Sequence, residues 1–262
     1  MPGDDNYTID YGSVRAAVRK RYPEWVSAFS DVESKARALQ HEPKVHRENL
    51  QELLVAVLYA RTLATVTAAM LIAEHGYDVQ CRVLLRSAME SLFSLVAIAK
   101  DAALAEAFVH ADEAERRRML RKSRSWSSPE LRRKAALHAT DDKLREIEAA
   151  IDEVNAKPIK VEDMAKAAGL HDWYLTAYAV FSGSVHNSVR DLERHLVLTG
   201  DRDIEALRNE PVTEQLDRLF LTASEILVKA VEALSLAFDL HTEEFRDKAM
   251  DRLQVLVGGI EG

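Results

Sequence analysis

Two oppositely charged residues stand within an otherwise apolar stretch of the chain. Between Val83 and Ala99 the only ionisable residues are Arg86 and Glu90, four positions apart, with apolar residues around both. On a helix this spacing puts both side chains on one face, and burying either charge alone costs several kcal/mol. The pair is therefore either a structural ion pair or part of a site for an anionic ligand.

A second arginine, Arg61, interrupts the apolar run from Leu53 to Ala73. If this run and the Arg86 stretch form an antiparallel helix pair joined near Gly76, Arg61 and Glu90 lie at similar distances from the turn and face each other. Two guanidinium groups on one carboxylate then leave positive charge for an anionic ligand or a second acid. In the alternative interpretation, the aliphatic part of the Arg61 side chain is buried and its guanidinium group reaches the surface.

Polar side chains also gather in the stretch from Tyr174 to Val189. The candidate ligand-binding residues there are Tyr178, Ser182, Ser184 and Asn187, with His186 as a candidate catalytic base. A histidine on an apolar helix is either a hydrogen-bonded core residue or a group that transfers protons. Both interpretations stay open at this point.

One segment of the chain is strongly basic. Between Arg116 and Lys134 there is a single acid, Glu130, in a chain whose formal net charge is −8. The basic residues are Arg116, Arg117, Arg118, Arg121, Lys122, Arg124, Arg132, Arg133 and Lys134. With Trp126 available for stacking, this corner attracts RNA, a nucleotide or an acidic partner surface. The alternative is a solvated helix end or a subunit contact, because basic residues complement the dipole at a helix C-terminus.

The composition excludes several broad classes of protein. With 262 residues, 47% hydrophobic and 30% charged, the chain can bury a sizeable core and is neither collagen-like nor disordered. One cysteine, Cys81, forbids an intramolecular disulfide and fits a reducing compartment. The acidic balance argues against wholesale wrapping of DNA. The polar N-terminus resembles no secretory signal, and Arg61 makes a membrane span costly, so we expect a cytoplasmic protein without a membrane segment.

Sparse glycines and prolines divide the chain into long stretches rich in helix-forming residues. Nine glycines and six prolines are too few for a loop-rich fold. The predicted helices cover about 12–39 with a break at Pro23, then 43–75, 78–100, 101–124, 129–155, 161–168, 172–198, 213–240 and a terminal helix after Thr242. The segment from His195 to Thr199 is the only weak strand candidate, and we expect no significant sheet.

The predicted architecture is all-α, a single multi-helix bundle-like domain. An N-terminal helical segment covers residues 1–42, the core bundle with the polar residues covers 43–200, and C-terminal helices in 201–262 pack on the core. No repeat of 20–50 residues is visible.

These residues resemble a known bacterial family, the domain of unknown function numbered 5677. The resemblance is carried by Leu85-Arg86-Ser87-Ala88-Met89-Glu90, by Ser182-x-x-x-His186-Asn187-Ser188, and by a short helix that ends in Ala-Gly-Leu170 before Tyr174. It covers about residues 49–199. The resemblance implies an all-α cytoplasmic domain in which Arg86, Glu90 and His186 converge, with no assigned activity.

Helical domains of this kind are compared with the HEPN group, many of whose members are metal-independent ribonucleases of toxin and phage-defence systems. The HEPN signature is an arginine followed by four to six residues and a histidine, and the sequence from Arg190 to His195 fits it. A chain rich in arginine yields such matches by chance.

The sequence therefore predicts a helical homo-oligomer that binds a small anionic ligand or partner through Arg86, Glu90 and His186, with a role in stress response or phage defence. One alternative is a HEPN-type ribonuclease in which His186 or His195 is the base and Arg86 or Arg190 binds phosphate. Another is a scaffold without a ligand. No pair of Glu-x-x-His sequences, phosphate-binding glycine loop or hydrolase elbow is present, so we expect neither a metal nor a cofactor.

Overall fold

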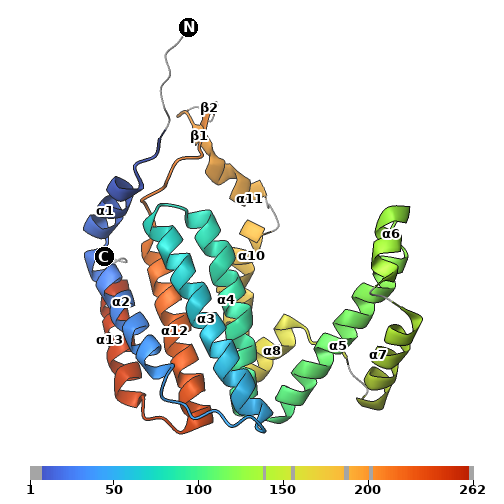
Figure 1. Ribbon diagram of the computed structural model, residues 1–262. Helices are drawn as coiled ribbons and strands as arrows, with labels where there is room; N and C mark the ends of the chain where they lie inside the picture. The colour runs from blue at the N-terminus through green and yellow to red at the C-terminus, as the bar shows by residue number, and fades with distance from the viewer. Residues whose placement is uncertain (1–7, 138–139, 155–156, 186–188, 201–202, 260–262) are drawn as a thin grey trace.

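Four long helices form the centre of the molecule. The computed structural model describes residues 8–137, 140–154, 157–185, 189–200 and 203–259. Helices α3 (Leu50–Glu74) and α4 (Asp78–Lys100) form an antiparallel pair, and α12 (Asp217–Phe238) packs against both of them and against α2 (Pro23–Leu39) (Figure 1). The all-α bundle predicted from the sequence is confirmed.

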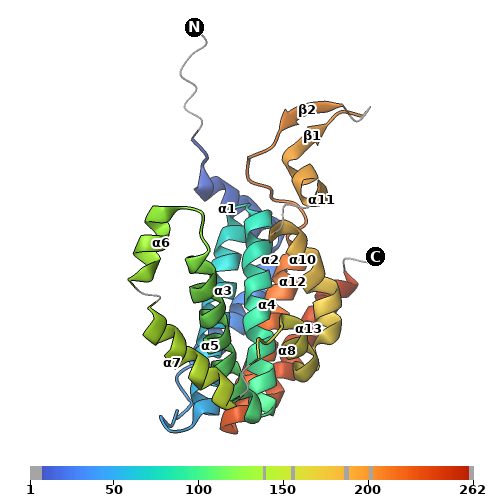
Figure 2. The same cartoon turned by 90° about the vertical axis from the view of Figure 1, so that its right-hand side faces the viewer.

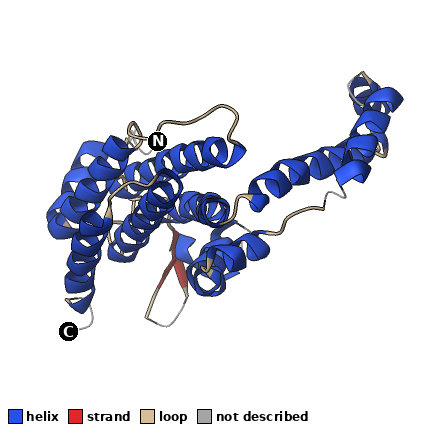
Figure 3. Ribbon diagram, turned by 90° about the horizontal axis from the view of Figure 1, so that it is seen from below, coloured by secondary structure: helices blue, strands red, loops and turns tan. Residues whose placement is uncertain are grey.

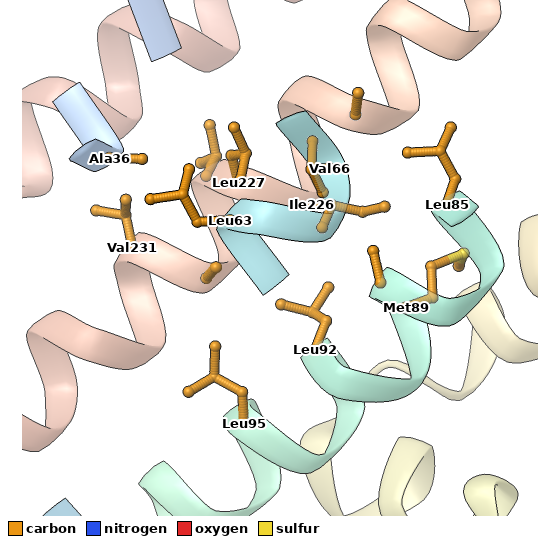
Figure 4. Packing of buried hydrophobic residues seen from close by; sticks show 14 of the residues in the cluster. Ala36, Leu63, Val66, Leu85, Met89, Leu92, Leu95, Ile226, Leu227 and Val231 are labelled. Atoms are coloured by element: carbon orange, nitrogen blue, oxygen red, sulfur yellow. The ribbon is translucent and has the colours of Figure 1, made fainter. Parts of the chain in front are cut away.

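The core between these helices is mostly aliphatic, with the buried aromatic rings of Tyr59, Phe93 and Phe220 among it. Leu63 and Val66 of α3 and Leu92 of α4 meet Ile226 and Leu227 of α12 (Figure 4). The same cluster of buried residues takes in Val18 near the N-terminus and Leu253 near the C-terminus. One main core therefore draws on all three segments into which the sequence was divided.

Shorter elements cover this centre. On the left side in Figure 1 lie α1 (Tyr11–Arg21) and α13 (Glu243–Gly258), and on the other side a chain of short pieces lies beside α4, as Figure 2 shows for α10. These pieces are α8 (Val161–Ala168), α9 (His171–Trp173), a π-helical turn (Tyr174–Tyr178), α10 (Ala179–Val185), α11 (Val189–Leu192) and a 3₁₀ turn (Glu193–His195).

Three helices form an arm that projects from the bundle (Figures 1 and 3). They are α5 (Ala103–Arg124), α6 (Pro129–Ala136) and α7 (Asp141–Val154). The root of α5 contacts α3 and α4, whereas α6 and α7 pack on α5. The arm has its own small apolar cluster, formed by Ala114 and Ile147 with Leu120.

Local signals set several of the helix ends as predicted. Pro23 is the first residue of α2, where its missing N–H is harmless, so the first predicted helix is broken there. Ser128 caps α6 through a bond from the Leu131 amide. Gly169 ends α8 with φ +73, a left-handed conformation that suits glycine. Helix α4 has the predicted bounds.

Three of the predicted helices are wrong in extent. Helix α3 begins at Leu50 and not after Pro43, because the side chain of Asn49 caps it. The helix predicted from Pro129 to 155 is two helices, α6 and α7. The last bundle helix begins at Asp217, and Thr213 does not cap it.

The predicted helix over 172–198 is also interrupted, and it ends in a hairpin. Strands β1 (Leu196–Leu198) and β2 (Ile204–Leu207) pair antiparallel at the one weak strand candidate, and they are the only sheet in the described residues. The chain then returns to the bundle, where the Val212 amide donates to the Gly76 carbonyl at 2.8 Å. The turn between α3 and α4 is thus hydrogen-bonded to the segment that follows the hairpin.

Among the described residues, one helix is long and apolar enough to cross a membrane, namely α3. Its buried residues include Val55, Leu63, Val66 and Met70, which pack in the main core. The core helix of a soluble bundle can be equally long and apolar. That α3 is such a core helix, and not a membrane span, stays a prediction.

Candidate functional site

Arg86 lies at the centre of a hydrogen-bonded network between α4 and α10. Its Nε donates to Ser182 Oγ at 3.0 Å and one terminal nitrogen donates to Tyr178 Oη at 2.8 Å. The other terminal nitrogen lies 3.1 Å from Glu90 Oε1. Tyr178 in turn donates to Glu90 Oε1 at 2.8 Å. The predicted pair and two of the predicted ligand-binding residues therefore meet in one network.

The tyrosine is held in place by its ring as well as by its hydroxyl group. The Arg86 guanidinium lies 4.8 Å from the centroid of the Tyr178 ring, which also stacks on Tyr174 at 5.0 Å. Burial, together with the bond to Glu90, raises the pKa of Tyr178 to about 12. The phenol is therefore a fixed donor at neutral pH. Both tyrosines lie on the π-helical turn, which presents them to α4.

The network continues along α4 toward its N-terminus. Asp78 and Arg82 stand eight and four residues before Arg86, so Asp78, Arg82, Arg86 and Glu90 form a column on the face next to α10. Arg82 packs over the Phe181 ring at 5.8 Å. The column is half-buried, since the side chains of Arg82 and Asp78 are each 13% exposed.

Two arginines share the carboxylate at the head of the column. Arg82 Nε lies 3.5 Å from Asp78 Oδ2, and Arg194 from the 3₁₀ turn donates to the same oxygen at 3.2 Å. Arg82 Nε is buried and makes no hydrogen bond among the described residues. The pKa of Arg82 is lowered, first by burial and then by repulsion from Arg194, and Asp78 offsets this only in part.

A cavity of about 450 Å³ opens beside Asp78 and Arg194. Its wall includes the first turn of α4, the 3₁₀ turn that carries Arg194, and the chain that returns from Arg208 to the bundle beside Gly76. His195 and Arg208 line it as well. The N-cap residue of α4, Tyr77, gives no side-chain cap, so the first amides of a 23-residue helix point toward this end.

Several predicted site residues lie elsewhere. Arg61 is exposed and donates from Nε to Ser91 Oγ at 3.1 Å, so the predicted pairing with Glu90 is wrong and the surface interpretation holds. The two helices cross so that Arg61 meets the next residue along α4. Ser184 is buried on α10.

His186 and Asn187 lie outside the described residues, and so does the side chain of Arg190. The predicted meeting of His186 with Arg86 and Glu90 therefore stays a prediction. His195 is exposed near the hairpin, and its Nδ1 lies 3.2 Å from the Arg208 carbonyl oxygen.

Arg82, Asp78 and Arg194 were missed by the sequence reasoning. The signal for the first two was present, because they continue the four-residue spacing of Arg86 and Glu90 by two turns. Nothing in the sequence places Arg194 beside Asp78, since 116 positions separate them.

The basic segment forms the outer end of the arm, where α5 leads into α6 (Figure 1). Many of its cations are paired with acids. The ion pairs are Arg116–Glu113, Arg118–Glu115, Arg121–Glu148, Arg124–Asp141 and Lys134–Glu130. Trp126 is 41% exposed.

No group of three histidine, cysteine or carboxylate side chains that suits a metal ion is found in the part of the chain that the structure describes. The absence of a metal or cofactor stays a prediction from the sequence.

Comparison with known proteins finds one relationship. No similar curated protein and no similar solved structure is found. A family model matches residues 52–204, which is more than half of the 262-residue chain and contains the whole α4–α10 column. The chain therefore belongs to DUF5677, a family of unknown function.

Proposed function

We propose that the protein binds a small anion, with phosphate as the chemical model, at the head of the α4–α10 column. The single observation that carries the proposal is that the guanidinium groups of Arg82 and Arg194 share one carboxylate, Asp78, beside the cavity. A negatively charged ligand at this point relieves the repulsion between the two arginines.

Two features of the surroundings favour the same chemistry, whereas the carboxylates of Glu210 and Glu214, which also line the cavity, oppose it. The uncapped first turn of α4 adds amide donors and the positive end of the helix dipole. Arg86 is the fixed part of the site, because Glu90, Tyr178 and Ser182 already hold it. It therefore positions the column. Arg194, which lines the cavity, is the group proposed to contact the ligand, and Arg82 acts through its contact with Asp78.

Thermal unfolding with added anions tests this proposal. Inorganic phosphate and a nucleoside monophosphate are compared with chloride at equal ionic strength. At a free anion concentration of about a hundred times Kd, binding adds about 2.7 kcal/mol, or roughly 5–10 °C in Tm for a chain of this size. Arg194→Gln, at a 41% exposed side chain, should lower the affinity about 10- to 100-fold without preventing folding.

Arg37→Gln is the matched control, because Arg37 is an exposed arginine in an ion pair on α2, with a side chain that is 53% exposed. It should keep the full shift in Tm. Equal shifts in Arg194→Gln and in the unchanged protein would disprove the assignment. If Arg82→Gln and Arg194→Gln lower Tm but no anion raises it, the column is structural and the scaffold alternative holds.

A metal-independent ribonuclease of HEPN type is the second candidate. The observation that favours it is that His195, Arg194 and Arg208 line the same cavity. A carbonyl oxygen only accepts hydrogen bonds, so the contact of Nδ1 with the Arg208 carbonyl places the proton on Nδ1 and leaves Nε2 free to accept one. Such a base can deprotonate a ribose hydroxyl while an arginine stabilises the phosphorane.

Cleavage of RNA in the presence of a chelator tests this candidate. His195→Ala should abolish cleavage while the protein stays folded, and His186→Ala tests the other predicted base. Unchanged cleavage in both variants, or no cleavage by the unchanged protein, would exclude this chemistry.

The cellular setting is proposed from the sequence alone. The cytoplasmic location rests on the single cysteine, Cys81, and on the cost of Arg61 in a membrane, whereas the role in stress response or phage defence rests on the resemblance to HEPN domains. Neither enters the argument for anion binding.

A further inference from the structure

The outer end of the arm holds cations that pair with no acid in the described part of the chain. Ion pairs account for five of the nine basic residues between Arg116 and Lys134. The other four are Arg117, Lys122, Arg132 and Arg133, for which no acidic partner is found among the described residues. They occupy the last turns of α5 and the middle of α6.

An exposed indole lies in the loop between the two helices that carry these cations. Trp126 lies in the loop between α5 and α6 and is 41% exposed. Arg132 donates to the Trp126 carbonyl oxygen at 3.0 Å, which ties α6 to the loop that bears the indole. Ser125 and Ser127 flank the indole and are exposed as well. The surface thus combines guanidinium groups, hydroxyl groups and one open aromatic face.

We infer that this corner binds single-stranded nucleic acid. Guanidinium groups match phosphate oxygens in two-pronged bonds, and an exposed indole stacks on a base of any identity. A flexible strand can place its phosphates and an unstacked base around one projecting corner, whereas the regular backbone of a duplex offers no free base to Trp126. The acidic remainder of the chain repels the strand elsewhere and so restricts binding to the arm.

Binding is measured by fluorescence anisotropy of a labelled 15-residue oligo(U), with a 15-base-pair RNA duplex for comparison. The single strand should bind more tightly than the duplex. If four phosphates are neutralised, log K falls against log salt with a slope of about −3, or roughly 50-fold between 50 and 200 mM salt. Trp126→Ala should weaken binding about 5- to 150-fold, and Trp126→Phe should keep most of it because a ring still stacks.

Charge reversal separates this corner from general electrostatics. The triple variant Lys122→Glu, Arg132→Glu, Arg133→Glu should bind at least a hundredfold more weakly. The control reverses three exposed cations outside the arm, Lys20, Lys44 and Arg47, and changes the net charge by the same amount. It should retain the affinity to within a few-fold.

Four outcomes overturn the inference. The first is that oligo(U) does not bind, and the second is that both triple variants weaken binding equally. The third is that the duplex binds as tightly as the single strand. The fourth is that vesicles containing anionic phospholipid are bound in place of oligo(U), since exposed Met119 and Leu131 also lie at this end of the arm. The inference concerns a surface apart from the cavity, so it stands or falls independently of anion binding there.

Discussion

The carboxylate of Glu74 fastens α1 to the end of α3. It accepts from Arg15 at 2.6 Å and from Arg19 at 3.0 Å, and its side chain is 9% exposed. Burial alone raises the pKa of Glu74, but the bonds from the two arginines outweigh this and lower it below its ordinary value of 4.5. The stabilisation is therefore present above pH 4.5 and is lost as the pH falls through the lowered pKa.

Glu74→Gln should reduce the free energy of unfolding by about 1–2 kcal/mol at pH 7, because two charge-assisted hydrogen bonds are weakened. The difference from the unchanged protein should shrink as the pH falls below 4. Urea unfolding at pH 7 and at pH 3.5 measures both quantities. A difference that is constant with pH would show that the charge of Glu74 contributes nothing.

Cys81 reports on the opening of α4. Its side chain is fully buried, and burial raises the pKa of the thiol to about 12. Because only the thiolate reacts with alkylating reagents, iodoacetamide at pH 8 should leave the folded protein unmodified and should label it fully in denaturant. Rapid labelling of the native protein, followed by mass spectrometry, would show that α4 opens locally.

At this scale, spacing along one helix could be predicted and contacts between helices could not. Arg86 and Glu90 pair as predicted because four residues make one helical turn. Arg61 does not reach Glu90, because the angle and rotation of packed helices depend on every side chain between them. Tyr178 and Ser182 were predicted as ligand-binding residues because they lie in one polar stretch and because of the family resemblance.

At the level of elements, Gly76 lies in the turn between α3 and α4, where the chain that returns from the hairpin contacts the bundle. Its φ is +81, and a Cβ at this position would lie 2.5 Å from Pro211 Cβ and 2.9 Å from the Val212 amide nitrogen. Gly76→Ala should therefore cost about 1–2 kcal/mol from the left-handed backbone alone, and the clash adds to this. The cavity wall formed by Gly76 and Val212 should also become more mobile.

Thermal unfolding checks this prediction, and Gly200→Ala is the control because no atom of the described residues lies within 4 Å of a Cβ there. The control should change stability by no more than about 0.5 kcal/mol. Equal Tm values for the two variants would mean that the turn adjusts at no cost.

Helix ends that are set by a residue at the end itself could be predicted from the sequence. Pro23 and Gly169 act through their own backbone, so the ends of α2 and α8 follow from local rules. The region from Asp172 to Leu198 reads as one helix by composition. It is instead divided among α9, the π-helical turn, α10, α11 and a strand, because contacts with α4 and the return to Gly76 override helix propensity.

At the level of the whole molecule, the arm should open more readily than the bundle. Its apolar cluster consists of Ala114, Ile147 and Leu120, whereas the main core extends through α2, α3, α4 and α12. Amides of α6 and α7 should exchange with deuterium well before those of α3 and α4. Mass-spectrometric exchange on the full chain measures this, and equal protection would mean that a partner covers the arm.

The segment from the π-helical turn to the hairpin offers a surface for the predicted homo-oligomer. Large apolar side chains are exposed at Leu175, Val180, Val189, Leu192, Leu198, Ile204 and Leu207. Light scattering after gel filtration should give a mass of about two chains, the commonest symmetric assembly. Ile204→Glu with Leu207→Glu should restore the mass of one chain. Val57→Glu, at an exposed position of α3, should not. A single-chain mass for the unchanged protein would contradict the prediction.

Because the bundle closes its core without the arm, selection can act on the two parts separately. Substitutions, insertions and deletions between Asp112 and Lys157 leave the packing of α3, α4 and α12 intact, so they carry little penalty for folding. We therefore expect DUF5677 relatives to diverge most in this region, and a change of partner during evolution to begin there while the bundle is inherited unaltered.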